Sequence, residues 1–142
     1  MKPHLEIIVM LALIAALMLV LTAPQKTVLT PSEIAKNADA YVGTLVTVRG
    51  TADASGIVCT LAVCPPADPC CNSCGGALVI TDGVMQLALE GTYQGKHVGC
   101  GGTNCDITCY PLAKGGQYTV NGTLNHRYDA YAIALEHYRE EK

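Results

Sequence analysis

The chain has 142 residues, of which half are hydrophobic and 15% are charged, and its net charge is −3. This balance is typical of a folded domain and excludes an intrinsically disordered chain. The nine Lys and Arg residues form no cluster. We therefore expect no nucleic-acid partner, because a phosphate backbone is bound by concentrated positive charge.

Residues 1–23 are predicted to form a signal anchor or transmembrane helix. Residues 7–21 are all apolar, with Lys2 before them and Pro24 after them. The run is short for a bilayer span, which needs about 20 residues. The small-x-small pattern of a cleavage site is missing, because Leu21 stands two residues before Ala23. We expect an uncleaved anchor that holds the domain at the membrane, and secretion after signal cleavage is the alternative.

After a linker at 24–31, residues 32–142 are predicted to form one domain. A short helix is expected over 32–40, because Thr30 or Ser32 can cap it and Pro31 and Glu33 favour a first turn. Alternation of apolar and polar residues then predicts five strands, at 45–52, 77–80, 84–90, 117–124 and 128–138. A helix is the alternative for the last segment. The Gly-, Pro- and Cys-rich segments 55–76 and 91–116 are predicted to be loops.

The expected fold class is therefore all-β, a five-stranded barrel with a short preceding helix. Gly50, inside the first strand, suggests a bulge or a sharp bend of the kind that small barrels need at their corners.

Two segments carry a resemblance to a known fold family. They are YVGTLVTVRG at 41–50 and YTVNGTL at 118–124. Both resemble the hallmark segments of OB-fold domains, and the similarity is closest to small bacterial extracytoplasmic OB-fold proteins and to the tRNA-anticodon-like OB group. It covers residues 32–138 and implies an OB-like barrel that binds oligonucleotides, oligosaccharides or proteins across one face. The cysteine-rich loops depart from this family, which has few cysteines.

Tyrosine supplies every aromatic side chain, because the sequence has no Phe and no Trp. Four tyrosines are candidates for a stacking surface on a ligand-binding face: Tyr93, Tyr110, Tyr118 and Tyr131. The alternative is that tyrosine takes the core positions that Phe and Trp occupy in other proteins.

Eight cysteines lie between positions 59 and 109, and we predict that they form four disulfides. An even number in a chain with an export signal favours disulfides, which would compensate for a core without Phe or Trp. About 105 pairings are possible, but the two groups hold five and three cysteines, so at least one bridge must join them. The groups are Cys59, Cys64, Cys70, Cys71 and Cys74, and then Cys100, Cys105 and Cys109.

Two other interpretations of the cysteines stay open. Cys71 and Cys74 form a CxxC followed by Gly-Gly, as in zinc knuckles, and with Cys100 and Cys105 they could hold zinc or an iron–sulfur cluster. The same CxxC could act in thiol–disulfide exchange, although no helix follows it to lower a thiol pKa.

No catalytic motif is found in the sequence, which has no Gly-x-Ser-x-Gly, phosphate-binding loop or dinucleotide fingerprint. We therefore expect a non-enzymatic binding or assembly module without a cofactor. It would face the periplasm or the cell exterior, held by its N-terminal helix, and would bind a protein or a glycan. The alternative function is that of a cysteine-ligated metal protein or a thiol-redox protein.

Overall fold

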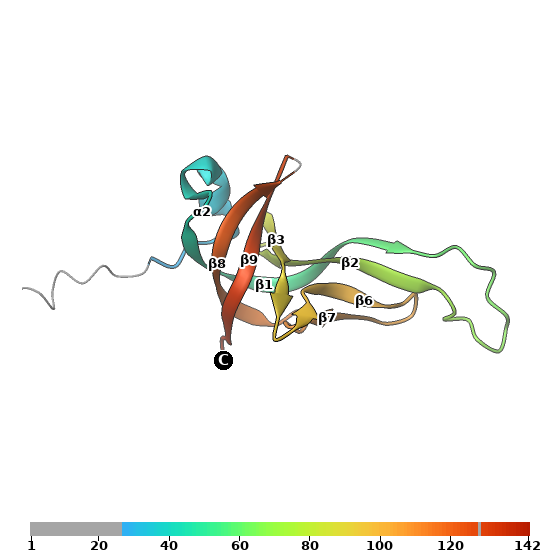
Figure 1. The fold of residues 1–142 in the computed structure, drawn as a ribbon. Helices are drawn as coiled ribbons and strands as arrows, with labels where there is room; N and C mark the ends of the chain where they lie inside the picture. Colours follow the sequence, from blue (N-terminus) through green and yellow to red (C-terminus); the bar gives the residue numbers. More distant parts are fainter. Residues whose placement is uncertain (1–26, 128) are drawn as a thin grey trace, which may run out of the picture.

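The computed structural model describes residues 27–127 and 129–142 and is mostly β, with a short helix at its N-terminal end (Figure 1). Helix α2 spans Pro31–Lys36, and the 3-10 turn η1 spans Ala38–Tyr41. Seven strands form one sheet: β1 (Leu45–Cys59), β2 (Ser73–Thr81), β3 (Gln86–Glu90), β6 (Gly99–Thr103), β7 (Ile107–Tyr110), β8 (Gln117–Arg127) and β9 (Ala130–Glu140). A separate two-residue hairpin pairs β4 (Thr92–Tyr93) with β5 (Lys96–His97).

Helix α2 begins where the sequence predicts it, with a capping box. The Thr30 hydroxyl accepts the Glu33 N–H at 3.3 Å, and the Glu33 carboxylate accepts the Thr30 N–H at 2.7 Å. The helix ends at Lys36 rather than at residue 40, because Asn37 leaves the helical region with φ −151°. Leu29 forms a bridge with Val48, so part of the segment expected to be a linker pairs with β1.

The strands pair in the order β1-β8-β9-β3-β2-β6-β7, and β1 also pairs with β2. All these pairs are antiparallel except β3 with β9, which is parallel. The expected five-stranded barrel is therefore replaced by a larger, seven-stranded sheet. The difference lies in the segment 91–116, predicted to be a loop, which supplies β6 and β7.

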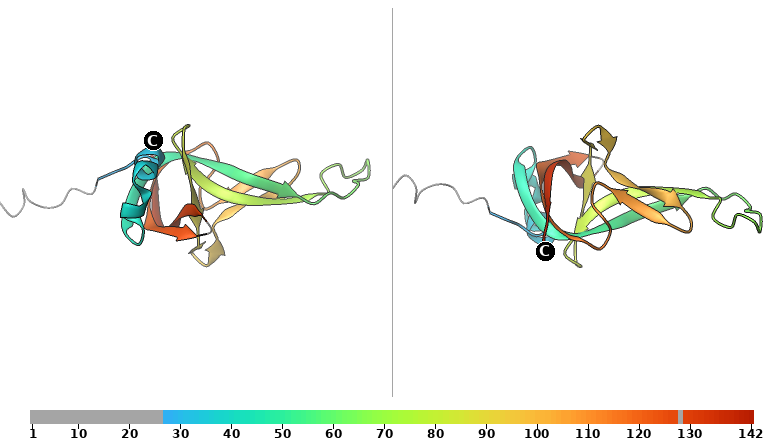
Figure 2. Two further views of the ribbon diagram at one scale, coloured as in Figure 1. Left: turned by 90° about the horizontal axis from the view of Figure 1, so that it is seen from above. Right: turned by 90° about the horizontal axis from the view of Figure 1, so that it is seen from below.

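The two added strands belong to an arm that projects from the rest of the molecule (Figure 2). We define the arm as residues 53–77 and 99–109, which contain the C-terminal half of β1, the N-terminal half of β2, and β6 and β7. A Cβ on Gly76 would lie 2.5 Å from the side chain of Ile57, so glycine allows the strands to approach closely there. These strands were not predicted from the sequence because the segment that contains them is rich in glycine, which is depleted in strands.

The core lies beside the arm and is built almost entirely from aliphatic side chains. In β1, Val46 and Val48 are buried while Leu45 and Arg49 are exposed, as the alternation predicts, but Thr47 on the face expected to be exposed is buried too. The last segment is a strand, β9, not a helix. The largest fully buried side chains come from α2, the β7–β8 connection and four strands: Ile34, Leu78, Ile80, Leu112, Leu124, Ile133, Val48 and Val120.

β1 pairs with β8 through Gly50 without a register shift, so the bulge, one of the two expectations for this residue, does not form there. A Cβ at this position would lie 2.5 Å from the carbonyl oxygen of Thr81, so glycine is required where β1 passes close to β2. The register shift between these strands falls instead between Ser55 and Val58.

The predicted membrane anchor, residues 1–23, lies outside the described residues. Within 27–127 and 129–142, no helix is long and apolar enough to cross a bilayer.

Candidate functional site

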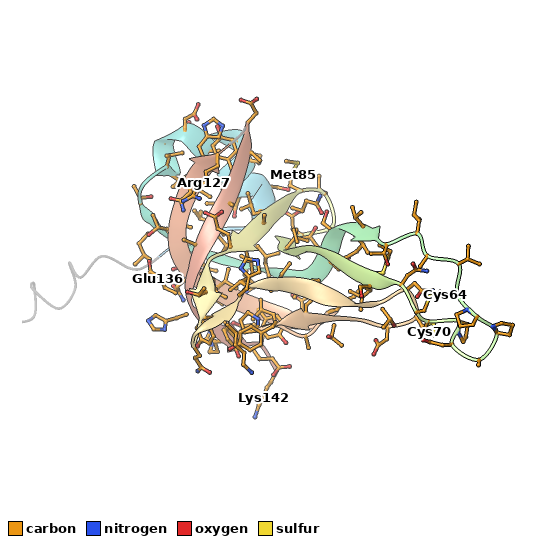
Figure 3. All side chains as sticks on the ribbon, turned by 45° about the vertical axis from the view of Figure 1, so that its right-hand side comes forward. Cys64, Cys70, Met85, Arg127, Glu136 and Lys142 are labelled. Carbon is orange, nitrogen blue, oxygen red and sulfur yellow. A yellow bond between two sulfur atoms is a disulfide. The ribbon has the colours of Figure 1, made fainter. Side chains whose placement is uncertain are left out.

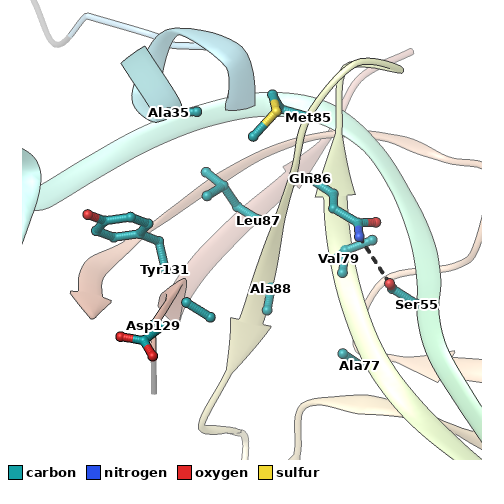
Figure 4. A pocket seen from close by; sticks show the side chains of 11 residues that line it. Ala35, Ser55, Ala77, Val79, Met85, Gln86, Leu87, Ala88, Asp129 and Tyr131 are labelled. Carbon is teal, nitrogen blue, oxygen red and sulfur yellow. Dashed lines mark hydrogen bonds between the residues drawn. The ribbon is translucent and has the colours of Figure 1, made fainter. Parts of the chain in front are cut away.

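A hollow of about 420 Å³ lies over the β2–β3 hairpin, between the middle of β1, the start of β9 and helix α2 (Figure 4). We call it the groove. Its lining comes from five separate parts of the chain: Ala35, Ser55, Ala77, Val79, Met85, Gln86, Leu87, Ala88, Asp129, Ala130 and Tyr131.

The alternation of side chains in two paired strands creates the floor of the groove. In β2, Leu78 and Ile80 point into the core, so Ala77 and Val79 face the other side of the sheet. Ala88 has the same orientation in β3, where it is paired with Val79. Because two of these three side chains are alanine, the floor is low and the surface is hollowed.

Most of the polar side chains at the edge of the groove, Asp129 excepted, are hydrogen-bonded. The Gln86 amide donates to the Ser55 hydroxyl at 3.2 Å, as Figure 4 shows. The Tyr131 hydroxyl donates to the Asp39 carboxylate at 2.6 Å, and this hydrogen bond is the main cause that raises the pKa of Tyr131. These pairings leave a mainly apolar surface, which suits an aliphatic group better than the hydroxyl groups of a sugar.

Asp82 fixes the wall of the groove by joining the β2–β3 turn to α2. Its carboxylate accepts the backbone N–H groups of Met85 at 2.9 Å, Val84 at 3.1 Å and Ser32 at 2.9 Å. These hydrogen bonds, that of Met85 above all, hold the pKa of Asp82 well below its usual range. The carboxylate therefore connects the turn that carries Met85 to the helix that carries Ala35.

Three of the four tyrosines considered as a ligand face lie together around Tyr138, and Tyr131 lies apart from them. Tyr93 packs on Tyr138 with ring centroids 5.3 Å apart, Tyr118 meets the same ring edge-on at 5.9 Å, and the Tyr110 hydroxyl donates to the Tyr93 carbonyl at 3.0 Å. Tyr118 is only 4% exposed and belongs to the core. Tyr131 lies at the opposite end of β9, beside the groove. Tyr118 is thus a core residue, Tyr93 and Tyr110 are half-buried beside it, and Tyr131 borders the candidate site.

All eight cysteines form disulfides, and the four bridges lie in the arm. Two bridges join directly opposite positions on neighbouring strands, Cys59–Cys74 and Cys100–Cys109. Cys64–Cys71 closes the loop at the end of the arm, and Cys70–Cys105 links that loop to the β6–β7 turn. The Cys70–Cys105 bridge confirms that the two cysteine groups are joined. The Cys100–Cys109 bridge contributes to the hydrophobic core, because Cys100 is buried in it and Cys109 packs against it, whereas the cysteines of the other three bridges lie outside that cluster.

The alternative metal ligands Cys71, Cys74, Cys100 and Cys105 are each bonded to a different partner. Cys71 and Cys74 are not bonded to one another, as an exchange-active CxxC pair would be. No group of three or more His, Cys, Asp or Glu side chains placed to hold a metal ion occurs in the part of the chain that the structure describes.

Sequence reasoning did not find the groove. One signal was available: outward positions of two strands predicted to pair carry Ala77, Val79, Gln86 and Ala88 instead of charged side chains. The contributions of α2, β1 and β9 depend on how the sheet folds back, which no local pattern in the sequence indicates.

Comparison with known proteins identifies no relative. No family model matches the chain, and neither the curated proteins nor the solved structures give a significant match. The function therefore has to be inferred from the groove, the arm and the cysteine chemistry.

Proposed function

We propose that this protein is a non-enzymatic, extracytoplasmic binding module that holds an aliphatic segment of a protein partner in the groove. The observation that carries the proposal is the groove itself, in which an alanine and valine floor is bordered by Gln86, Ser55 and Tyr131, whose polar groups are already hydrogen-bonded. A protein is the better partner than a glycan, because glycan hydroxyls need free hydrogen-bonding groups at the site.

The cysteine chemistry supports the location. Four disulfides indicate an oxidising environment such as the periplasm or the cell exterior, because cytosolic thiols are kept reduced. We further propose that the apolar run at 7–21 anchors the module at a membrane, with release by signal cleavage as the alternative.

The strand pairing supports an OB-like relationship, which we put forward as part of the proposal. β1 pairs with β2 and β8, and β3 pairs antiparallel with β2 and parallel with β9. The groove lies on the β2–β3 face of this arrangement. The β6–β7 strands would then be an addition between the third and fourth strands of the shared plan.

The proposal is tested by selecting linear peptides from a random phage-displayed library on the oxidised, full-length protein. Ala88→Glu places a carboxylate in the groove floor, and Ala113→Glu makes the same change at an exposed loop position away from it. We expect selected peptides to contain aliphatic residues and to lose at least about tenfold in affinity with Ala88→Glu, because the apolar contact is replaced by a charge. Unchanged binding by Ala88→Glu, with loss in Ala113→Glu, would refute the assignment of the groove.

A further inference from the structure

The end of the arm presents the most exposed aliphatic side chains among the described residues. We call the segment 60–72 the tip loop. Within it, Leu61 is 98% exposed and Val63 is 99% exposed. Figure 3 shows Cys64 and Cys70 of this loop at one extreme of the molecule, far from Met85 of the groove. The tip loop is therefore separate from the groove and needs its own explanation.

The tip loop is held in a fixed shape. One disulfide closes it between Cys64 and Cys71, and a second ties Cys70 to Cys105 in the neighbouring turn. Leu61 and Val63 are thus presented on a rigid support, and little conformational freedom is lost when they are buried by a partner.

The backbone between these two side chains has its hydrogen bonds satisfied inside the loop. The Asn72 side chain accepts the Ala62 N–H at 2.7 Å and donates to the Ala62 carbonyl at 3.2 Å. Pro65, Pro66 and Pro69 carry no N–H at all. Backbone groups that are paired or missing lower the cost of placing a segment in an environment without water.

The composition of the tip loop favours a lipid surface over a protein pocket. The residues that dominate binding energy at protein interfaces are Trp, Tyr and Arg, which the loop lacks, whereas Leu and Val, which it exposes, are under-represented there. Its exposed apolar residues are Leu, Val, Ala and Pro. Asp68 is the only charged residue of the loop. A second carboxylate, that of Asp106, follows Cys105, to which the loop is bonded. No Lys, Arg or His occurs between Arg49 and Lys96, so an anionic surface would be repelled.

We propose that the tip loop inserts Leu61 and Val63 into the outer apolar layer of a zwitterionic lipid bilayer. The contact is shallow and reversible, because only two aliphatic side chains enter and Asp68 stays at the water interface. This second contact with lipid is independent of the ligand in the groove.

The test uses the absence of Trp from the sequence. Val63→Trp places a single fluorescent reporter at the tip, and Val84→Trp places the same reporter at an 83% exposed position on the β2–β3 turn. Each full-length, oxidised variant is mixed with phosphatidylcholine vesicles with and without brominated acyl chains. We expect a blue shift and quenching by bromine for Val63→Trp and neither for Val84→Trp. An unshifted, unquenched reporter at position 63 would overturn the proposal, as would equal quenching at both positions.

Two further measurements sharpen the result. Adding Leu61→Ser to the Val63→Trp protein is expected to reduce bromine quenching of the reporter at position 63, because a leucine side chain is lost from the contact with lipid. Replacing part of the phosphatidylcholine by phosphatidylglycerol is expected to reduce quenching at position 63. Stronger quenching with the anionic lipid, or no effect of Leu61→Ser, would contradict the proposed contact.

Discussion

The bridge between Cys70 and Cys105 is the one disulfide that joins the two halves of the arm, and its removal should cost more than that of any other bridge. It spans 35 residues, whereas Cys64–Cys71 spans 7. The entropy that a disulfide removes from the unfolded chain grows with the logarithm of the number of residues in the loop it closes. These separations therefore correspond to stabilisation by about 4 and about 2 kcal/mol.

We therefore expect Cys70→Ser/Cys105→Ser to lower the free energy of unfolding by about 4 kcal/mol, and Cys64→Ser/Cys71→Ser to lower it by about 2 kcal/mol. The assay is urea unfolding of both double variants and the parent protein under non-reducing conditions, followed by circular dichroism. An equal or smaller loss for the Cys70/Cys105 pair would refute the reasoning. A transition unchanged in both variants would show that the arm opens without affecting the core.

Three further predictions concern stability, each checked by thermal or urea unfolding. Asp82→Asn should cost about 1 kcal/mol at neutral pH, because an amide accepts backbone N–H groups less strongly than a carboxylate. The pKa of Asp82 is lowered in the folded state, so this contribution to stability is present above the unfolded-state pKa of about 4 and is lost as the pH falls towards the folded-state value. The difference in stability between parent and variant should therefore narrow below about pH 4. A difference that widens there would contradict the role assigned to Asp82. Gly50→Ala should cost about 1–3 kcal/mol through overlap with the Thr81 carbonyl, while Gly75→Ala, whose nearest neighbour would be 3.9 Å away, is the control with a smaller effect. Thr30→Ala should cost about 1 kcal/mol by removing the cap of α2, and no change would show that packing of Ile34 alone maintains the helix.

Much of the sheet could be predicted from the sequence, because its strands alternate between a buried and an exposed face. Val46 and Val48 in β1 and Ile133 and Leu135 in β9 follow this pattern, and their burial matches it. The cap of α2 is equally local, and Thr30, one of the two residues that the sequence offers for it, is the N-cap. These features depend on neighbours in the chain, which is the information that a single sequence contains.

The arm and the groove depend on contacts between distant residues. β6 pairs with β2 through Gly101 and Gly75, and glycine carries no pattern that indicates a strand. The groove combines Ala35 with Tyr131, which meet only when α2 and β9 reach the same side of the β2–β3 hairpin. The tyrosine face was proposed from composition, and the positions of the rings depend on the path of β9.

The central claim is that the sulfur atoms are oxidised in four defined pairs that shape an extracytoplasmic module. Its most direct test is mass spectrometry of proteolytic fragments from the native protein, with free thiols blocked at cell lysis. We predict a cross-linked peptide joining Cys70 to Cys105 and no blocked thiol at any of the eight positions. A Cys71–Cys74 linkage, or thiols that react with the blocking reagent in the cell, would contradict the account.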